Sequence, residues 1–461
     1  MYTEKEILAE EKRDGEAIAA KWERLGDILT ELSDRESAEK ILSAFREYYR
    51  EMLSPRELTE WVAGLYDVGT GGFYYSNSAR DNEGFLPDLE STTQALGWFH
   101  SFSLGADLGR EISEYYPDWM KESLVRFIKE KQDVNGYFYH PQWTAEETDK
   151  RPHRRGRDLT WATRMLAWLG EAPTYDTPNG VKGSGIGADG KPVADYTPSG
   201  GCAAPSEERV TPELKDRESF EEFLSGLDVV KRSWHVGNLL ESICSQIEAR
   251  DKRLCELGAD YRLSDILAEW LAKSQSPKTG LWGNELCCYT VNGLLKIGAA
   301  FSKIRKPIPH IAEGIRSAIA VIEGDEQVTN VCDVLNPWYA LNVMIGNVKD
   351  FGGSDDTVSE CRRYVFLHAP EMIRKTKERL LGFKKPDGSF SYQPEFSSHI
   401  SQGMPVAVYE SREGDVNATM IATRAVVTHI FDLLGVRRIP LFGEADRMRF
   451  INTVEAARSR G

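Results

Sequence analysis

"TGGFYYSNSARDNEGFLPDLESTTQAL", residues 70–96, joins two different kinds of segment. Its first part is a turn-rich loop in which two glycines precede three consecutive aromatic residues. Its second part, from Pro87, predicts a helix whose first turn carries Asp88 and Glu90. If an aromatic loop before a helix with acidic first residues recurs along the chain, it is a structural unit of the fold.

The same pattern does recur along the chain. Each copy has an amphipathic helical pattern, then a turn with glycine and aromatic residues, then a mostly apolar helix that begins on polar residues. Two further apolar helices, at 233–247 and 332–346, lack the aromatic turn. The other copies of the turn lie at 129–143, 272–283 and 382–396.

Two sets of helices therefore alternate along the chain, and strand-like alternation is scarce. The apolar set should be buried on most faces, and the amphipathic set should cover it. This alternation predicts an all-α protein, an (α/α)6 barrel whose inner helices direct their polar first turns into one funnel. The apolar helices are expected at 88–103, 158–170, 233–249, 285–302, 332–346 and 415–435. The amphipathic helices are expected at 55–66, 113–131, 216–226, 261–274, 307–323 and 366–383.

The chain is expected to form a single toroid domain over residues 1–461. Residues 1–54 predict an N-terminal helical extension packed outside the barrel. Residues 172–212 are rich in Gly, Pro, Ser and Asp without periodicity, which predicts a long loop or lid.

The turns "KSQSPKTGLWG" (273–283) and "FKKPDGSF" (383–390) resemble those of the terpenoid cyclase and protein prenyltransferase toroids. The segment "GGFYY" before a Q-A helix is similar to the sugar-epimerase and glycosidase types of (α/α)6 barrel. The cyclase D-x-D-D acid is absent at "PDLES" (87–91), and the zinc ligands of the prenyltransferases are not matched at 285–289 or 414–419. The resemblance implies a shared fold, and function must be argued from the site.

Carboxylates interleaved with Trp and Tyr at the predicted helix heads are typical of a sugar site. Aromatic rings stack on pyranose rings, and a pair of carboxyl groups can supply the acid and base of glycoside hydrolysis. The candidate catalytic residues are Asp88, Asp158, Asp333, Asp415 and His235. The candidate substrate-binding residues are Glu90, Arg154, Arg157, Trp161, Trp234, Asn336, Trp338, Tyr339 and Asn417.

Each of these acids has an alternative interpretation as a helix N-cap, where Asp is favoured. Among the four, Asp333 and Asp415 are slightly preferred for catalysis because an Asn follows each at short spacing. A second hypothesis makes His235 and Tyr339 the base and acid of a polysaccharide lyase. A third is an isoprenoid cyclase or transferase, and a fourth is a toroid that only binds its ligand.

The segment "DKRPHRRGRD" (149–158) is strongly basic in a chain of net charge −15. Read as a loop at the funnel rim, it predicts that Arg154 and Arg157 clamp a carboxylate or sulfate, which favours an acidic sugar. The alternative is a solvated surface loop.

The remaining bulk features exclude several classes of partner. The net charge of −15 argues against nucleic acid as a partner, and no run is apolar enough for a membrane span. With no signal peptide visible and seven scattered cysteines, a cytoplasmic location is expected. No cofactor is expected, metal binding by Glu285, Cys287 and Cys288 is a minority hypothesis, and homo-oligomer formation stays open.

Overall fold

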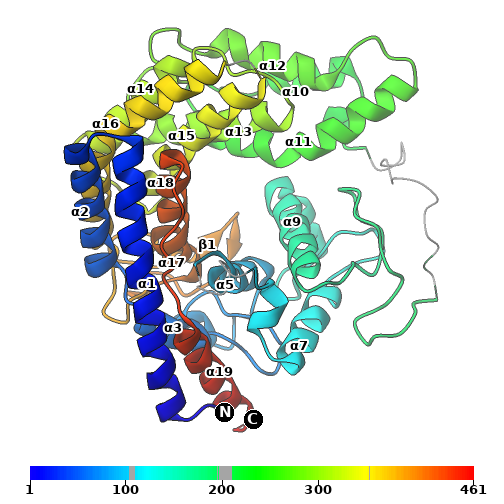
Figure 1. Cartoon of the computed structure of the whole chain (residues 1–461). Coiled ribbons are helices and arrows are strands. Elements are labelled where there is room, and N and C mark those ends of the chain that lie inside the picture. Colours follow the sequence, from blue (N-terminus) through cyan, green and yellow to red (C-terminus); the bar gives the residue numbers. More distant parts are fainter. Residues whose placement is uncertain (103–108, 195, 197–209, 352–353, 461) are drawn as a thin grey trace.

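The computed structural model describes residues 1–461 except 103–108, 195, 197–209, 352–353 and 461. Helices dominate the part of the chain that is described, and the β-strands assigned there are the two-residue β1 (Ile400–Ser401) and β2 (Met404–Pro405). These two strands form an antiparallel hairpin. The prediction of an all-α protein is confirmed (Figure 1).

One set of helices forms a continuous series of contacts. Each helix of the series contacts the next, α15 contacts α18, and α17 contacts α5, so the series returns to its first member (Figure 1). The members are α5 (Leu89–Phe102), α9 (Pro152–Trp168), α11 (Ser233–Glu256), α13 (Cys288–Lys303), α15 (Cys332–Phe351) and the segment α17 (Val416–Met420), η4 (Ile421–Ala425) and α18 (Val426–Leu434).

A second set of helices precedes these members one by one along the chain. Several of these helices pack on the first set: α12 contacts α11, α14 contacts α13 and α15, and α16 contacts α15 and α18. The second set comprises α3 (Pro55–Gly64), α7 (Asp118–Lys129), α10 (Arg217–Ser225), α12 (Leu263–Ser274), α14 (Ile311–Glu323) and α16 (Asp355–Leu381).

The N-terminal residues form two long helices outside this arrangement. In Figure 1, α1 (Glu4–Leu32) and α2 (Arg35–Met52) run side by side along one flank. Helix α1 also contacts α19 (Glu444–Arg458), and α2 contacts α16. Shorter elements are α4 (Asn77–Arg80), η1 (Ile112–Tyr115), α8 (Ala145–Asp149) and η3 (Pro212–Leu214).

The repeated glycine of the aromatic turns has the same backbone conformation in every copy. Gly71, Gly136, Gly280 and Gly388 have φ values of 86°, 83°, 68° and 81°. This left-handed region is accessible to glycine at little cost. A Cβ at Gly71 would also lie 2.5 Å from the carbonyl oxygen of Ser123 in α7. The turn therefore requires glycine both for its conformation and for its close approach to a neighbouring helix.

The predicted helices of both sets match observed ones, with one important difference at α9. Residues 149–158 were expected to be a basic loop, but α9 begins at Pro152 and includes Arg154 and Arg157. A proline is well accommodated in the first turn of a helix, so Pro152 marks the helix start. Of the expected loop at 172–212, residues 195 and 197–209 lie outside the described part of the chain. Among the residues described, no helix is both long and apolar enough to cross a membrane.

Candidate functional site

A completely buried arginine connects the heads of α5 and α9. Arg154, in the first turns of α9, donates from Nε to Asp158 Oδ2 at 2.9 Å, one helical turn further on. Its Nη1 lies 3.3 Å from Oε2 of Glu90 on α5. The guanidinium also lies 4.4 Å from the centre of the Trp143 ring. Arg154 is thus held by two carboxyl groups and an aromatic face, and it is not the exposed rim residue that the sequence predicted.

Three further ionisable groups surround this arginine. Asp88 lies directly before α5, and its Oδ1 accepts from the backbone N–H of Ser91 at 2.8 Å, which is a helix-capping interaction. Nζ of Lys131 donates to the carbonyl oxygen of Phe127 at 2.8 Å. His140 Nε2 lies 2.6 Å from the carbonyl oxygen of Pro87. All three groups are buried, so the charge of Asp88 acts on Arg154, Asp158 and Glu90 in a medium of low polarity.

Burial shifts the protonation of this cluster strongly. It raises the pKa of the Asp158 carboxyl to about 7, although Arg154 opposes the shift. Burial also raises the pKa of Glu90, again against the attraction of Arg154. It lowers the pKa of Lys131 to about 7 and that of His140 to about 4. Asp158 and Lys131 therefore both have a pKa near neutral pH, a property typical of acid–base sites.

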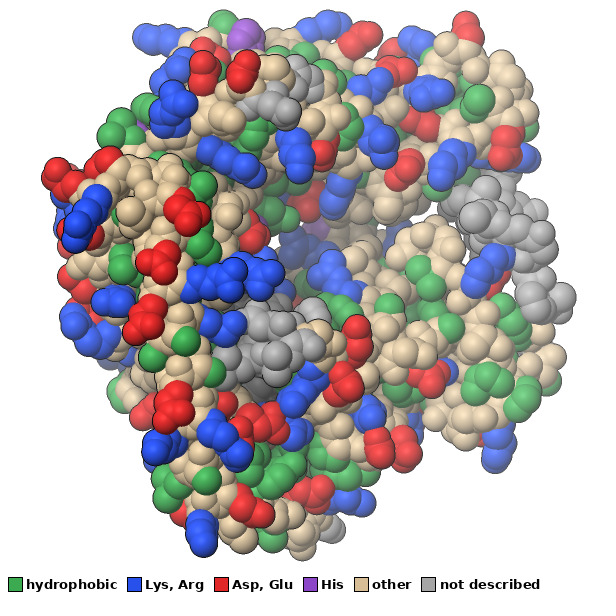
Figure 2. Space-filling model, viewed as in Figure 1, with side chains coloured by type: hydrophobic (Ala, Val, Ile, Leu, Met, Phe, Trp, Pro, Cys, Tyr) green, Lys and Arg blue, Asp and Glu red, His purple; other side chains and the backbone are tan. Residues whose placement is uncertain are grey.

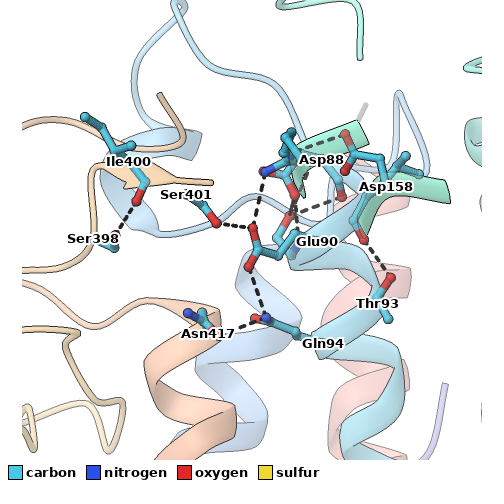
Figure 3. Close-up of polar contacts among 12 residues, drawn as sticks. Asp88, Glu90, Thr93, Gln94, Asp158, Ser398, Ile400, Ser401 and Asn417 are labelled. Carbon is cyan, nitrogen blue, oxygen red and sulfur yellow. Dashed lines mark hydrogen bonds and ion pairs between the residues drawn. The ribbon is translucent and has the colours of Figure 1, made fainter. Parts of the chain in front are cut away.

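The β1–β2 hairpin covers the cluster. The Ser401 hydroxyl hydrogen-bonds to Oε2 of Glu90, and Gln94 Nε2 lies 3.5 Å from Oε1 of the same carboxylate (Figure 3). Gln94 also donates to Oδ1 of the half-buried Asn417 at 2.9 Å. Asp158 Oδ1 and Arg154 Nη2 are buried without a hydrogen-bond partner. The cluster is closed in this conformation, and two of its polar atoms are left available for a ligand or water.

One face of α9 carries arginine and tryptophan in alternation. Arg157, Trp161, Arg164 and Trp168 are spaced four, three and four residues apart and are all at least partly exposed. Such spacing places them on one side of a helix. Figure 2 shows a hollow in the middle of this view with Lys and Arg side chains at its rim and in its depth.

Residues of α11 and α13 lie opposite this face. Nη2 of Arg157 donates to Asn238 Oδ1 at 3.4 Å. Glu241 on α11 pairs with Lys296 on α13 at 2.9 Å, and the charge of Arg157 acts on both groups. The pKa of Glu241 falls to about 2, because Lys296 and Lys303 outweigh its burial. This acid is therefore paired with Lys296 and Lys303.

His235 and Tyr339, the predicted lyase pair, each contact a different side chain. The exposed His235 has its Nδ1 2.9 Å from the hydroxyl of Tyr289, beside Trp234. Tyr339 instead stacks on His429, with ring centres 4.2 Å apart. Each predicted partner thus has another aromatic or imidazole neighbour that the sequence pattern did not single out.

Asp415 has the hydrogen bonds of a helix cap, whereas Asp333, in the first turn of α15, holds the residues that precede its helix. Oδ2 of Asp333 accepts from the backbone N–H groups of Thr329 and Asn330, at 3.0 and 3.2 Å, and from both side chains. Asp415 accepts from three backbone N–H groups at 2.8 to 3.1 Å. The contacts of Asp415 favour the capping interpretation that the sequence left open, and those of Asp333 favour another structural role, so we do not carry the two acids into the proposed mechanism.

Trp338 does not belong to a ligand-binding wall. Its side chain is fully buried, and its Nε1 donates to Thr376 of α16 at 2.9 Å. The role in sugar stacking expected from the sequence is incompatible with this position. Asn336 is also buried, at 5% exposure. The aromatic ring available on α15 is that of Tyr339, which is 36% exposed.

The hydrogen bonds of Asp333 to the segment before α15 lead to an expected result. We expect Asp333→Ala to lower the free energy of unfolding by about 2 kcal/mol, because several donors lose their acceptor. Activity of the folded fraction should be unchanged. Chemical denaturation measures the first effect, and Asp350→Ala, an exposed residue at the other end of α15, is the control. Loss of activity at unchanged stability would contradict this structural role.

The cysteine-rich segment is organised by helix capping. Cys287 is the N-cap of α13, and the backbone N–H of Cys288 donates to Glu326 at 2.7 Å. The cysteines of the described residues are free thiols. Within the same residues, no group of three or more His, Cys, Asp or Glu side chains is arranged to hold a metal ion.

Comparisons with known proteins found no relative: no family model matches the chain, and neither the curated proteins nor the solved structures contain a match. The site therefore has to be interpreted from its own geometry. Sequence analysis missed Lys131, His140 and Ser401. His140 follows the aromatic turn directly in "YFYHPQW", which is a signal that could have been used, whereas Ser401 has no such signal.

Proposed function

We propose that the helices form an (α/α)6 toroid, with α5, α9, α11, α13, α15 and α17–α18 as its inner ring. Support comes from the series of contacts, which runs through these helices in chain order and returns to α5. The alternation of the two helix sets along the chain is the other support.

We propose that the protein is a glycoside hydrolase that acts on acidic oligosaccharides. The observation that carries this proposal is the pair of buried carboxyl groups, Asp158 and Glu90, joined through Arg154 at the heads of adjoining helices. Asp158, with a pKa raised by burial to about 7, suits the proton donor to the leaving oxygen. Glu90 is assigned as the second carboxylate. The charge of Asp88 raises the pKa of both carboxyl groups.

Substrate access requires the β1–β2 hairpin to move. Ser401 hydrogen-bonds to Glu90, so displacement of this hydroxyl would expose the carboxylate toward Asn417 and Gln94. The face of α9 with Arg157 and Trp161 then offers a cation and a stacking surface for an acidic sugar ring. Arg154 would hold Asp158 in position without touching the substrate.

The pH dependence of activity tests the assignment of the proton donor. Reducing-end release from acidic and neutral oligosaccharides is the assay. Asp158 must be protonated to act, so we expect activity to fall as the pH rises through about 7, the raised pKa of its carboxyl. Activity that stays constant from one pH unit below this value to one unit above it would contradict the assignment.

A lyase is the second candidate, because Tyr339 stacks on His429. Burial and two arginines lower the pKa of His429 to about 4, so its imidazole is neutral and able to take a proton at neutral pH. A lyase removes the proton beside a uronate carboxylate and breaks the bond to the leaving oxygen, which gives an unsaturated sugar. Ultraviolet absorbance of the product distinguishes it from a hydrolase product. We do not propose isoprenoid chemistry, since charged side chains are frequent on the inner helices.

A further inference from the structure

Two arginines of the inner helices have no acidic partner. Among the described residues, neither Arg164 of α9 nor Arg424 of η4 forms an ion pair or a hydrogen bond that would neutralise it. By contrast, the neighbouring Arg438 is paired with Asp432 at 3.0 Å. Arg424 is half-buried, and charges at such positions are normally paired, whereas Arg164 is exposed to solvent.

The position of Arg424 is fixed by three elements. A Cβ built at Gly97 of α5 would lie 2.6 Å from Nη1 of Arg424 and 3.4 Å from the ring of Trp168 on α9. The guanidinium of Arg424 thus lies over Gly97 and beside Trp168. Trp168 follows Arg164 by one helical turn on α9. The turn η4 (Ile421–Ala425) is a π-helical insertion, a feature that occurs frequently at functional sites.

The charge of Arg164 adds to the cost of burying Arg424. Burial, with Arg438 and Arg164, lowers the pKa of Arg424 to about 10. The charge of Arg164 also acts on Tyr339 of α15. A protein retains such an arrangement where function requires it, because local strain and unfavourable charge concentrate at binding sites.

We propose that Arg164 and Arg424 form an anion-binding site beside Tyr339 and His429, and that it takes an oxyanion: a carboxylate, sulfate or phosphate. Guanidinium groups bind such anions through paired, charge-assisted hydrogen bonds. Assigning this oxyanion to the carboxylate of an acidic sugar rests on the proposed function, whereas the anion site itself does not. Arg164 follows Arg157 by seven residues, about 10 Å along the helix, so the site is separate from the Asp158 cluster.

Calorimetric titration of the full chain at low ionic strength tests the site. The probes are glucuronate, inorganic sulfate and inorganic phosphate, with glucose as the uncharged counterpart of glucuronate. We expect at least one anion to bind and glucose not to bind, and Arg424→Gln and Arg164→Gln each to weaken the affinity about tenfold or more. Arg56→Gln, on the outer helix α3, should bind as the original protein does. If glucuronate binds and sulfate and phosphate do not, the ligand of the site is a sugar carboxylate. If sulfate or phosphate binds, the ligand is one of these other oxyanions.

Thermal unfolding gives a second measurement that does not depend on weak binding. In the absence of anions, Arg424→Gln should unfold at a higher temperature than the original protein, because an unpaired charge is removed. The bound anion should raise Tm of the original protein but not that of the variant. The proposal is overturned if no anion binds, or if both arginine variants bind and respond as the original protein does. Turnover is not measured in either experiment, so this failure is distinct from a failure of the hydrolase proposal.

Discussion

Replacing Asp158 with asparagine is expected to reduce kcat by about a hundredfold to ten-thousandfold, the range for loss of a general acid. Near and below neutral pH the native carboxyl is mostly protonated, because burial raises its pKa to about 7. Asparagine matches this neutral acid in size and charge and can still accept from Arg154 Nε. It cannot release a proton to a leaving oxygen, so the loss should appear in kcat.

The same substitution should leave the fold nearly unchanged, which separates a chemical effect from a structural one. Arg154 retains its contact with Glu90 in this variant. The matched control is Asp149→Asn, in α8 just before α9, where the carboxylate pairs with Arg155 on the outside at 3.1 Å. A control as inactive as the variant, or an Asp158→Asn protein with full activity, would refute the role of Asp158 as proton donor.

The helices could be predicted because their signals are local. Apolar spacing in segments such as 288–303 and 311–323 produces one helix that is buried on most faces and one that is buried on a single face. The repeated turn glycines, such as Gly71 and Gly280, could be recognised in the sequence because a turn with positive φ at this position favours glycine. Successive members of the apolar set contact one another, and the proposed toroid rests on this observation.

The site was less predictable because its contacts join distant segments. Arg154 looked like part of an exposed basic loop, and only the packing of α9 on α5 buries it between Glu90 and Asp158. Ser401 reaches Glu90 across more than 300 positions of sequence. Trp338 was expected to stack on a sugar, but it lies on the side of α15 that packs against α16. Residue type predicts the chemistry of such a position, while orientation depends on the tertiary fold.

Arg154 is expected to be the most important single ionic residue for stability. We expect Arg154→Met to lower the free energy of unfolding by about 3–5 kcal/mol, the cost of removing one member of a buried ion pair. Methionine fills much of the same volume, so most of the loss comes from leaving Asp158 and Glu90 without their cation. Urea denaturation measures the effect. The neighbouring Arg155→Met, whose partner Asp149 is 45% exposed, should cost less than about 1 kcal/mol.

The loss in Arg154→Met should also depend on pH, which distinguishes charge from packing. Arg154 lowers the pKa values of Asp158 and Glu90 against the effect of burial, so its removal raises both values further. A carboxyl whose folded pKa lies above its unfolded value loses stability as the pH rises from the unfolded pKa to the folded one. The destabilisation should therefore be larger above pH 7 than near pH 5. Equal losses at the two pH values would show that Arg154 acts through its packing against Trp143 rather than through its charge.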